Sequence, residues 1–418
     1  MNNIRRSVSF GLAAALLSGC VGGSTSAPSA PRVARSEFRP VPNPGFDAWV
    51  TAFRARALAR GIPPGTVDAA FRGVGFLPDV VERDRNQTEF KRSLEDYLAI
   101  VANEDRVAAG RAKLRRYGGL LAEVESRFGV EAHVVAAIWG VESRFGERRG
   151  DVPVISALAT LAYDGRRGAF FESQLVAALR ILQRGDVTPA RMLGSWAGAM
   201  GHTQFIPTSY EAFAVDFRGD GRRDIWSDDP TDALASAAAY LNRSGWRRGQ
   251  PWGVEVRLPE GFNSALTGRG TSRPVADWRA QGVRLAGGGA VPDHGPSSIL
   301  TPAGAAGPAF LIFRNFTVIT RYNNAVNYVI GVGHLSDRLR GGPPIRGRFP
   351  PDAAGLSIAD RKLLQRQLTA AGFDAGDADG VIGTKTRDAI RAYQRSVGLP
   401  ATGEPSRELL GRLKRDAL

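Results

Sequence analysis

Apolar residues recur at intervals of three and four positions from Phe46 to Trp252, as in the segments FDAWVTAFRARALARG and DALASAAAYLNRSGW. This spacing places apolar side chains on one face of a helix and predicts one large helical body. From Gly253 to about Phe316 the pattern changes to alternating stretches between Gly- and Pro-rich turns, which predicts a small inserted β element. Helix is expected to return at about Asn324, so that the body spans residues 45–340.

Two further segments follow the body. Residues 341–355, GGPPIRGRFPPDAAG, are rich in Pro and Gly and are predicted to be a linker. Residues 356–414 are predicted to form a compact unit of their own. The chain shows no internal repeat with a period of about 20–50 residues, which argues against a solenoid.

The amino terminus carries the pattern of an exported lipoprotein. Arg5 and Arg6 precede an apolar stretch, residues 8–17, that is too short to span a bilayer as a helix. Leu17-Ser18-Gly19-Cys20 follows, and it resembles a bacterial lipobox with the only cysteine of the chain at the lipid-bearing position. We therefore predict a signal peptide over residues 1–19 and lipidation of Cys20; the alternative is a chance cysteine after a hydrophobic run.

The residues after Cys20 indicate where the mature protein resides. Residues 20–44 are rich in Gly, Ser, Ala and Pro and are predicted to be a flexible tether without a fold. Val21 stands where a retention signal for the inner membrane usually places Asp. By resemblance to bacterial lipoproteins, we expect a periplasmic protein that is anchored to the outer membrane through lipid on Cys20.

The net charge and the cysteine count exclude several classes of partner and of chemistry. The formal net charge of +14 favours an anionic partner, such as nucleic acid, acidic lipid or an acidic polymer. Export from the cytoplasm argues against nucleic acid. One cysteine, four histidines and no HExxH pattern exclude a disulfide framework, a cysteine-rich zinc site and thiol chemistry in the mature core.

One carboxylate stands out on the segment Val134–Gly146. On a helical wheel, Val134, Ile138, Val141 and Phe145 form an apolar stripe, and Glu142 falls about 80° from Val134, inside the apolar arc. Burial should raise the pKa of this carboxyl, which glycosidic bond cleavage requires of its acid. The alternative is a core carboxylate paired with a distant Arg.

Three separated motifs stand in order along the chain. They are Trp139-Gly140-Val141-Glu142-Ser143-Arg144-Phe145-Gly146, then Ser195-Trp196-Ala197-Gly198-Ala199-Met200-Gly201-His202-Thr203-Gln204-Phe205-Ile206-Pro207-Thr208-Ser209-Tyr210, then Thr320-Arg321-Tyr322-Asn323. Together they resemble the membrane-bound lytic murein transglycosylase B family. The resemblance implies a mainly α, lysozyme-like catalytic body. It also implies cleavage of the β-1,4 bond between N-acetylmuramic acid and N-acetylglucosamine, with formation of 1,6-anhydromuramic acid.

The resemblance also implies roles for single residues. Glu142 matches the family's catalytic acid/base. The positions that match substrate-binding residues are Ser195, Gln204, Tyr210, Tyr322 and Asn323. Neutral donors and acceptors suit sugar hydroxyls and acetamides. A two-carboxylate glycosidase would instead need a second acid, for which Glu147, Asp151 and Asp164 are the nearest candidates in sequence.

The segment from Asp216 to Trp226 resembles the start of a calcium-binding EF-hand loop. Asp216, Asp220 and, through an altered loop, Asp232 are weak candidate ligands. Arg218 occupies a position where an oxygen ligand is expected, so a turn held by Asx-type hydrogen bonds is favoured. No metal and no cofactor are expected.

Residues 356–414 resemble the small three-helix peptidoglycan-binding domain of cell-wall enzymes. The resemblance rests on Gly372-Phe373, Asp377-Ala378-Asp379-Gly380-Val381-Ile382-Gly383, Thr386-Arg387-Asp388-Ala389-Ile390 and Gly398-Leu399-Pro400. We therefore expect a monomeric, lipid-anchored lytic transglycosylase with peptidoglycan as its partner and no nucleic acid. The competing hypothesis is a non-catalytic murein-binding lipoprotein that kept the fold.

Overall fold

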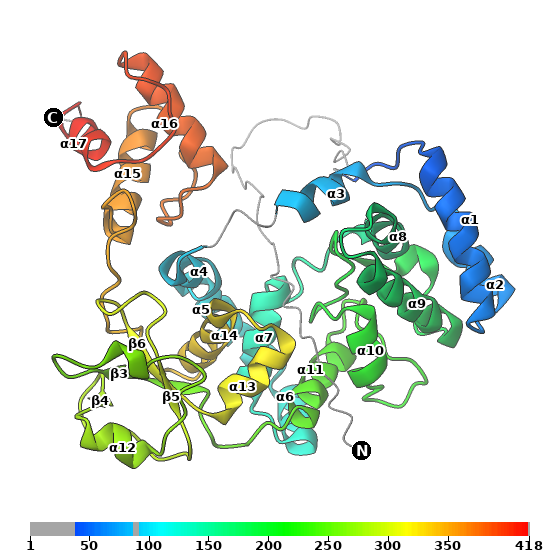
Figure 1. Ribbon diagram of the computed structural model, residues 1–418, viewed down its shortest axis with the longest axis horizontal. Helices are drawn as coiled ribbons and strands as arrows, with labels where there is room; N and C mark the ends of the chain where they lie inside the picture. Colours follow the sequence, from blue (N-terminus) through cyan, green and yellow to red (C-terminus); the bar gives the residue numbers. More distant parts are fainter. Residues whose placement is uncertain (1–37, 87–91, 417–418) are drawn as a thin grey trace. The chain divides into compact units, whose positions relative to one another are not determined.

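The computed structural model describes residues 38–86 and 92–416. These residues divide into two compact units (Figure 1). The α7 unit comprises residues 38–86 and 108–248, and the sheet unit comprises residues 92–107 and 249–416. The predicted signal peptide, Cys20 and most of the predicted tether lie outside the described residues.

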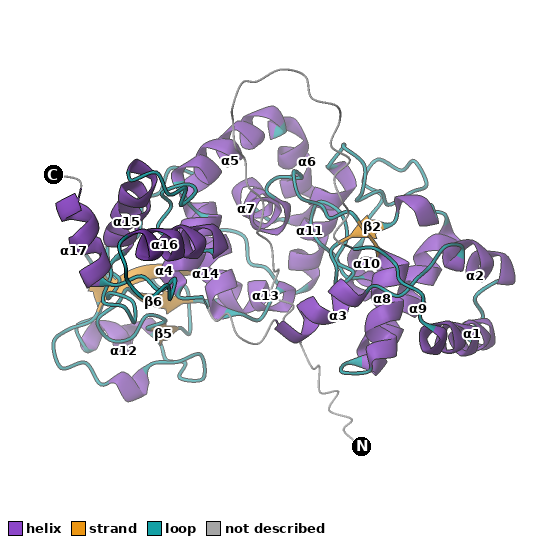
Figure 2. Cartoon of the chain, turned by 90° about the horizontal axis from the view of Figure 1, so that it is seen from above, coloured by secondary structure: helices purple, strands orange, loops and turns teal. Residues whose placement is uncertain are grey.

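Helices dominate the fold, and the strands are few and short (Figure 2). The α7 unit contains α1 (Pro44–Ala59), α2 (Pro64–Phe71), α3 (Pro78–Arg85), α6 (Gly118–Phe128), α7 (Ala132–Ser143), β1 (Val152–Pro153), α8 (Val154–Asp164), α9 (Gly168–Arg184), the 3-10 helix η2 (Pro189–Arg191), β2 (Leu193–Gly194), α10 (Pro207–Phe213) and α11 (Thr231–Arg243). The unit boundary falls inside α5 (Glu104–Arg116). The predicted helical character of residues 46–252 is confirmed, but residues 92–107 belong to the sheet unit, so these helices do not form one body.

The sequence marks several of these helices at their first turn. Pro lies at the first helical positions of α1, α2, α3 and α10, where its missing N–H costs no hydrogen bond. Asn43 caps α1 by accepting a hydrogen bond from the Phe46 backbone N–H at 3.0 Å. Helix α7 packs against α6 and α11 and is buried throughout residues 134–143, so it forms the centre of its unit.

The end of the predicted tether differs from the expectation. The Val41 N–H donates to the Phe76 carbonyl at 2.9 Å, and the Arg83 guanidinium lies 4.8 Å from the Phe38 ring centroid. Residues 38–43 are therefore part of the fold. Composition misses this because the pairing is set by a distant segment of the chain.

The sheet unit is built around a four-stranded antiparallel sheet of order β4-β3-β6-β5. Its elements are α4 (Leu94–Val101), β3 (Gly253–Arg257), the 3-10 helix η3 (Ser264–Leu266), α12 (Val275–Ala280), β4 (Arg284–Leu285), β5 (Ser298–Leu300), β6 (Ala309–Ile312), α13 (Arg314–Tyr322), α14 (Val326–Leu339), α15 (Ile358–Ala370), α16 (Thr384–Ser396) and α17 (Arg407–Asp416). A core that includes Trp278, Ile299 and Leu311 lies between the sheet and α12. The predicted β element is confirmed, whereas helix returns at Arg314 and not at about Asn324.

The last three helices form the predicted three-helix domain. Helices α15, α16 and α17 enclose a separate apolar core that contains Leu364, Ile390 and Leu410. Ser357 and Asp360 form a capping box at the start of α15, since each side chain accepts the other residue's backbone N–H.

Within the described ranges, no helix combines the length and the apolar character that crossing a bilayer requires.

Candidate active site

Glu142 lies in the last turn of α7 and is only 5% exposed, which confirms its predicted place on the buried side. The helix ends at Ser143, one residue later, whereas the wheel continued it to Gly146. Arg144, Phe145 and Gly146 have φ angles of 52°, 59° and 89°, all in the left-handed region. Because two of these three are not glycine, the turn is strained and its surroundings must hold it.

Ser143 and His202 hold that turn. The Ser143 hydroxyl donates to the His202 carbonyl at 2.6 Å and accepts the Gly146 N–H at 3.0 Å. The segment after Glu142 is thereby joined to the second motif of the sequence. The structure thus brings together two motifs that stand far apart along the chain.

The His202 ring is a further support that sequence reasoning did not assign. Its Nδ1 lies 3.1 Å from Trp139 Nε1, and its Nε2 lies 2.8 Å from the Ser227 carbonyl. Indole N–H only donates and a carbonyl only accepts, so the neutral ring with hydrogen on Nε2 fits both contacts. Burial lowers the pKa of His202 to about 4, with the nearby Arg149 also disfavouring the charged form. The sequence signal for this role was the position of His202 inside the second motif. Its neighbour in the structure is Trp139, a buried residue of the first motif.

Ser195 stands at the start of the Gly-rich turn that follows β2. Its hydroxyl accepts the backbone N–H groups of Ala197 at 3.3 Å and Ala199 at 3.0 Å. A Cβ on Gly150 would lie 2.2 Å from the Gly194 carbonyl and 2.6 Å from the Ser195 nitrogen. The backbone before the Ser195 turn therefore packs directly against Gly150.

Gln204 has a left-handed backbone, with φ of 50°. Its amide nitrogen donates to the Arg149 carbonyl at 3.0 Å and to the Gly201 carbonyl at 2.8 Å. These two bonds use both amide hydrogens and fix the side chain. The same Arg149 donates through its guanidinium to the carbonyls of Trp226 and Ser227.

Tyr210 differs from the expected position in a saccharide site. Its side chain is 0% exposed, its hydroxyl donates to the Arg223 carbonyl, and the Arg223 guanidinium lies 4.7 Å from the ring centroid. Burial raises the pKa of this phenol far above its usual range. In this conformation Tyr210 packs in the core and does not line a surface.

Tyr322 and Asn323 lie at the end of α13, in the sheet unit. The Tyr322 ring stacks on Tyr328 with an interplanar angle of 12° and a centroid distance of 6.5 Å. The Asn323 side chain is buried and accepts the Ala325 N–H at 3.0 Å. They belong to the sheet unit, and Glu142 belongs to the α7 unit.

The candidate second acids have different environments. Glu147 and Asp151 are exposed. Asp164 accepts an ion-paired hydrogen bond from Arg85 at 2.6 Å. Glu147 and Asp151 are therefore open to solvent, whereas the Asp164 side chain is enclosed but ion-paired.

The calcium-like loop is closed by its own carboxylates. Asp216 accepts the backbone N–H groups of Gly219, Asp220 and Gly221, and Asp232 accepts those of Phe217 and Asp224. These bonds hold the segment as an Asx-type turn, as the sequence favoured. Over residues 38–86 and 92–416, no three His, Cys, Asp or Glu side chains are grouped so as to hold a metal ion.

Comparison with known proteins identifies the family of this chain. Residues 45–337 match the family model described as "Transglycosylase SLT domain", and residues 357–413 match "Putative peptidoglycan binding domain". Membrane-bound lytic murein transglycosylase B of Escherichia coli (strain K12) is 33% identical over 238 residues, which is 55% of this chain. The chain spans 63% of the length of that curated relative.

Two solved structures of SltB3 from Pseudomonas aeruginosa are also similar. One is in complex with NAG-anhNAM-pentapeptide and the other with NAG-NAM-pentapeptide, with TM-scores of 0.72 and 0.73. Each is 50% identical, and the match covers 89% of this chain and 100% of that chain. These findings confirm the resemblance seen in the motifs, and the chain belongs to the family of the transglycosylase SLT domain.

Proposed function

We propose that this protein is a lytic transglycosylase that cleaves the β-1,4 bond between N-acetylmuramic acid and N-acetylglucosamine of peptidoglycan. The observation that carries the proposal is Glu142, a carboxyl enclosed at the end of a buried helix and followed by a strained turn. A relative with half of its residues identical was solved with NAG-anhNAM-pentapeptide, a ligand that carries an anhydro sugar.

The proposed reaction needs one carboxyl. Glu142 first gives its proton to the oxygen that leaves with N-acetylglucosamine, while the muramyl acetamido group stabilises the cationic sugar carbon. The resulting carboxylate then takes the proton of the muramyl C6 hydroxyl, and that oxygen bonds to C1. Glu142 ends protonated, as it began, and no water enters the products. Enclosure serves this cycle because it favours the neutral acid at the start.

Ser195 and Gln204 are proposed to orient the sugar. Since the Ser195 hydroxyl already accepts two backbone N–H groups, its own hydrogen can be donated to a sugar oxygen. Both amide hydrogens of Gln204 are engaged, so its carbonyl oxygen is the atom that can accept from a hydroxyl or an acetamide N–H. Tyr322 and Asn323 are proposed to supply contacts from the sheet unit.

We further propose that the protein acts in the periplasm, anchored to the outer membrane by lipid on Cys20. The support is the export pattern of residues 1–20, the Gly/Ser-rich segment after it and Val21. The positive net charge suits an anionic wall polymer, and residues 357–413 supply a domain of the peptidoglycan-binding class.

Mass spectrometry of murein digests tests the activity. Wild-type protein should release 1,6-anhydromuramyl products, and Glu142→Gln should lower their rate at least about 100-fold, because the amide cannot supply the proton. Glu147→Gln is the matched control, since this exposed acid lies on the same turn, and it should retain activity.

Other outcomes contradict parts of the proposal. Products that carry an added water would mean hydrolysis, and loss of activity in Glu147→Gln would favour a second carboxylate. Full activity in Glu142→Gln would remove this residue from the mechanism. Murein binding by wild-type protein without any product would favour the non-catalytic lipoprotein.

A further inference from the structure

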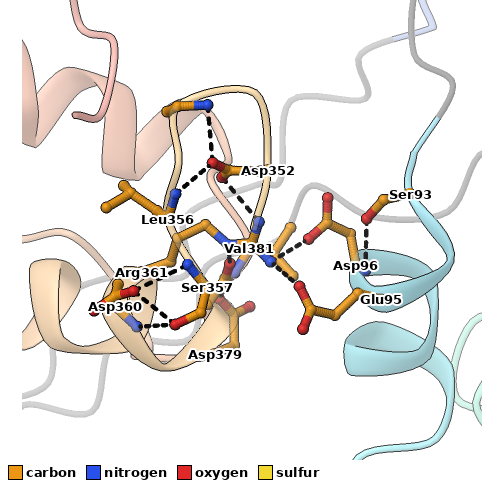
Figure 3. A network of polar contacts seen from close by, with 12 residues as sticks. Ser93, Glu95, Asp96, Asp352, Leu356, Ser357, Asp360, Arg361, Asp379 and Val381 are labelled. Atoms are coloured by element: carbon orange, nitrogen blue, oxygen red, sulfur yellow. Dashed lines mark hydrogen bonds and ion pairs between the residues drawn. The ribbon is translucent and has the colours of Figure 1, made fainter. Parts of the chain in front are cut away.

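One arginine of the peptidoglycan-binding domain joins three other segments of the sheet unit. Arg361 lies near the start of α15 and is 3% exposed. Its Nε donates to the Gly380 carbonyl at 2.7 Å, and its Nη1 donates to Asp352 at 2.9 Å. Its Nη2 donates to Glu95 at 2.9 Å and to Asp96 at 2.8 Å (Figure 3).

The partners of Arg361 belong to different parts of the chain. Glu95 and Asp96 lie in the first turn of α4, within the transglycosylase segment. Asp352 lies in the predicted linker, and Gly380 lies in a turn of the binding domain itself. A single buried guanidinium thus connects the binding domain, the linker and the transglycosylase segment.

Helix α4 offers a fixed point for this contact. It packs against α14 so closely that a Cβ on Gly331 would lie 2.6 Å from Tyr97 Cε1 and 3.0 Å from Val101 Cγ2. Ser93 caps the helix by accepting the Asp96 backbone N–H at 3.1 Å. The two carboxylates therefore project from a helix end that is itself held in the sheet unit.

The linker is bound at two places. The backbone N–H groups of Arg346 and Gly347 donate to the Glu255 carboxylate on β3, the latter at 2.6 Å. Asp352 accepts the Leu356 N–H with one oxygen and binds Arg361 with the other. The Pro/Gly composition predicted a linker, and the contacts show that this one is attached to its neighbours.

Because the Arg361 cluster is buried, each of its charged groups needs its partners. Four hydrogen bonds use four of the five N–H groups of the guanidinium. Burial raises the pKa of Glu95, whose side chain is 13% exposed, and the Arg361 charge acts in the opposite direction. Removal of one partner from such a buried set leaves the others uncompensated and is strongly destabilising. The full set of four hydrogen bonds forms only when the binding domain lies against α4, because Glu95 and Asp96 belong to that helix.

We propose that Arg361 is a positioning residue that locks the peptidoglycan-binding domain onto the start of α4. This rests on the proposed function. A murein strand on the docked domain is then held in one orientation to the sheet unit, which also carries Tyr322 and Asn323. Polymeric murein that is long enough to contact both the binding domain and the region of Tyr322 and Asn323 binds more tightly because of the lock. Short soluble fragments gain no affinity from it.

The test removes the contact from the α4 side only. The double variant Glu95→Gln/Asp96→Asn leaves the bonds of Arg361 to Gly380 and Asp352 in place, so the binding domain keeps its internal structure. Glu404→Gln is the control, since it removes a carboxylate paired with Arg387 inside the domain, at an exposed site. Circular dichroism checks that helix content is unchanged in both variants.

Two readouts follow for the full chain. Trypsin cleavage of the linker at Arg346 and Arg348 should be at least about tenfold faster in the double variant, because undocking frees the linker. The murein concentration that gives half-maximal rate should rise at least about tenfold, while turnover of a soluble tetrasaccharide stays at the wild-type value. The control should match wild type in both.

Three results would overturn the lock. These are a cleavage rate equal to that of wild type, an unchanged dependence on murein concentration, and an equal loss on polymer and tetrasaccharide. If wild-type protein cleaves neither substrate, the proposed function fails by itself. Linker cleavage and co-sedimentation with murein then still decide whether Glu95 and Asp96 dock the domain.

Discussion

Gly146→Ala tests whether His202 holds the turn that follows Glu142. Gly146 has φ of 89°, and a Cβ there would lie 2.5 Å from both Cε1 and Nδ1 of the His202 ring. The ring cannot move away freely, because it is bound to Trp139 and Ser227 and is 3% exposed. The substitution should therefore strain the backbone and the packing together.

The expected size has two parts. An alanine in the left-handed region costs about 1–2 kcal/mol, and overpacking a buried site adds about 1–3 kcal/mol. Gly129→Ala isolates the first part, because Gly129 has φ of 65° at the end of α6 and nothing lies within 4 Å of its added Cβ. We expect a loss of unfolding free energy of about 2–5 kcal/mol for Gly146→Ala and about 1–2 kcal/mol for Gly129→Ala.

Urea unfolding followed by tryptophan fluorescence measures both losses, and murein digestion measures the consequence for activity. Gly146→Ala should also lose activity, since the turn begins two residues after Glu142, and Gly129→Ala should keep it. Equal losses of stability in the two variants would refute the reasoning. They would mean that the His202 ring yields to the new methyl group at no cost.

Three further predictions concern pH, metal and membrane. The folded protein holds the pKa of His202 at about 4 against an ordinary value of 6.5, so the unfolded chain binds the proton more readily. The free energy of unfolding should therefore fall by about 3 kcal/mol as the pH drops from 6.5 to 4, and His202 should not affect it above pH 6.5. In urea titrations, the His202→Gln variant should lack this part of the decline. Calcium should leave the melting temperature unchanged, because Arg218 stands where an oxygen ligand is expected; a clear rise would contradict this. Cys20→Ala should release the protein from membranes in cell fractionation, and an unchanged distribution would exclude lipidation as the anchor.

Local patterns carried most of the fold. Three-and-four spacing located α1 and α11, and alternation located the β element, because these signals depend only on neighbouring residues. The same spacing placed Glu142 on the buried side. The spacing failed one residue later, because the helix ends at Ser143, whose hydroxyl donates to the His202 carbonyl. Periodicity contains no information about such a distant partner.

Composition was the weaker guide. Pro and Gly made residues 341–355 a linker, yet Glu255 and Arg361 bind it through contacts that composition does not encode. Tyr210 has the residue type of a sugar contact, but its burial depends on Arg223 and on the whole unit. The roles of Ser195, Gln204, Tyr210, Tyr322 and Asn323 remain predictions.

The division of the chain also affects how it can assemble. Helix α4 buries Leu94, Leu98 and Val101 and packs against α14, but the whole stretch 108–248 is made between the two helices. Loop closure over such a distance is slow, so α4 must wait for its partner with an apolar face uncovered. A chain interrupted before Leu339 would leave that face open to aggregation.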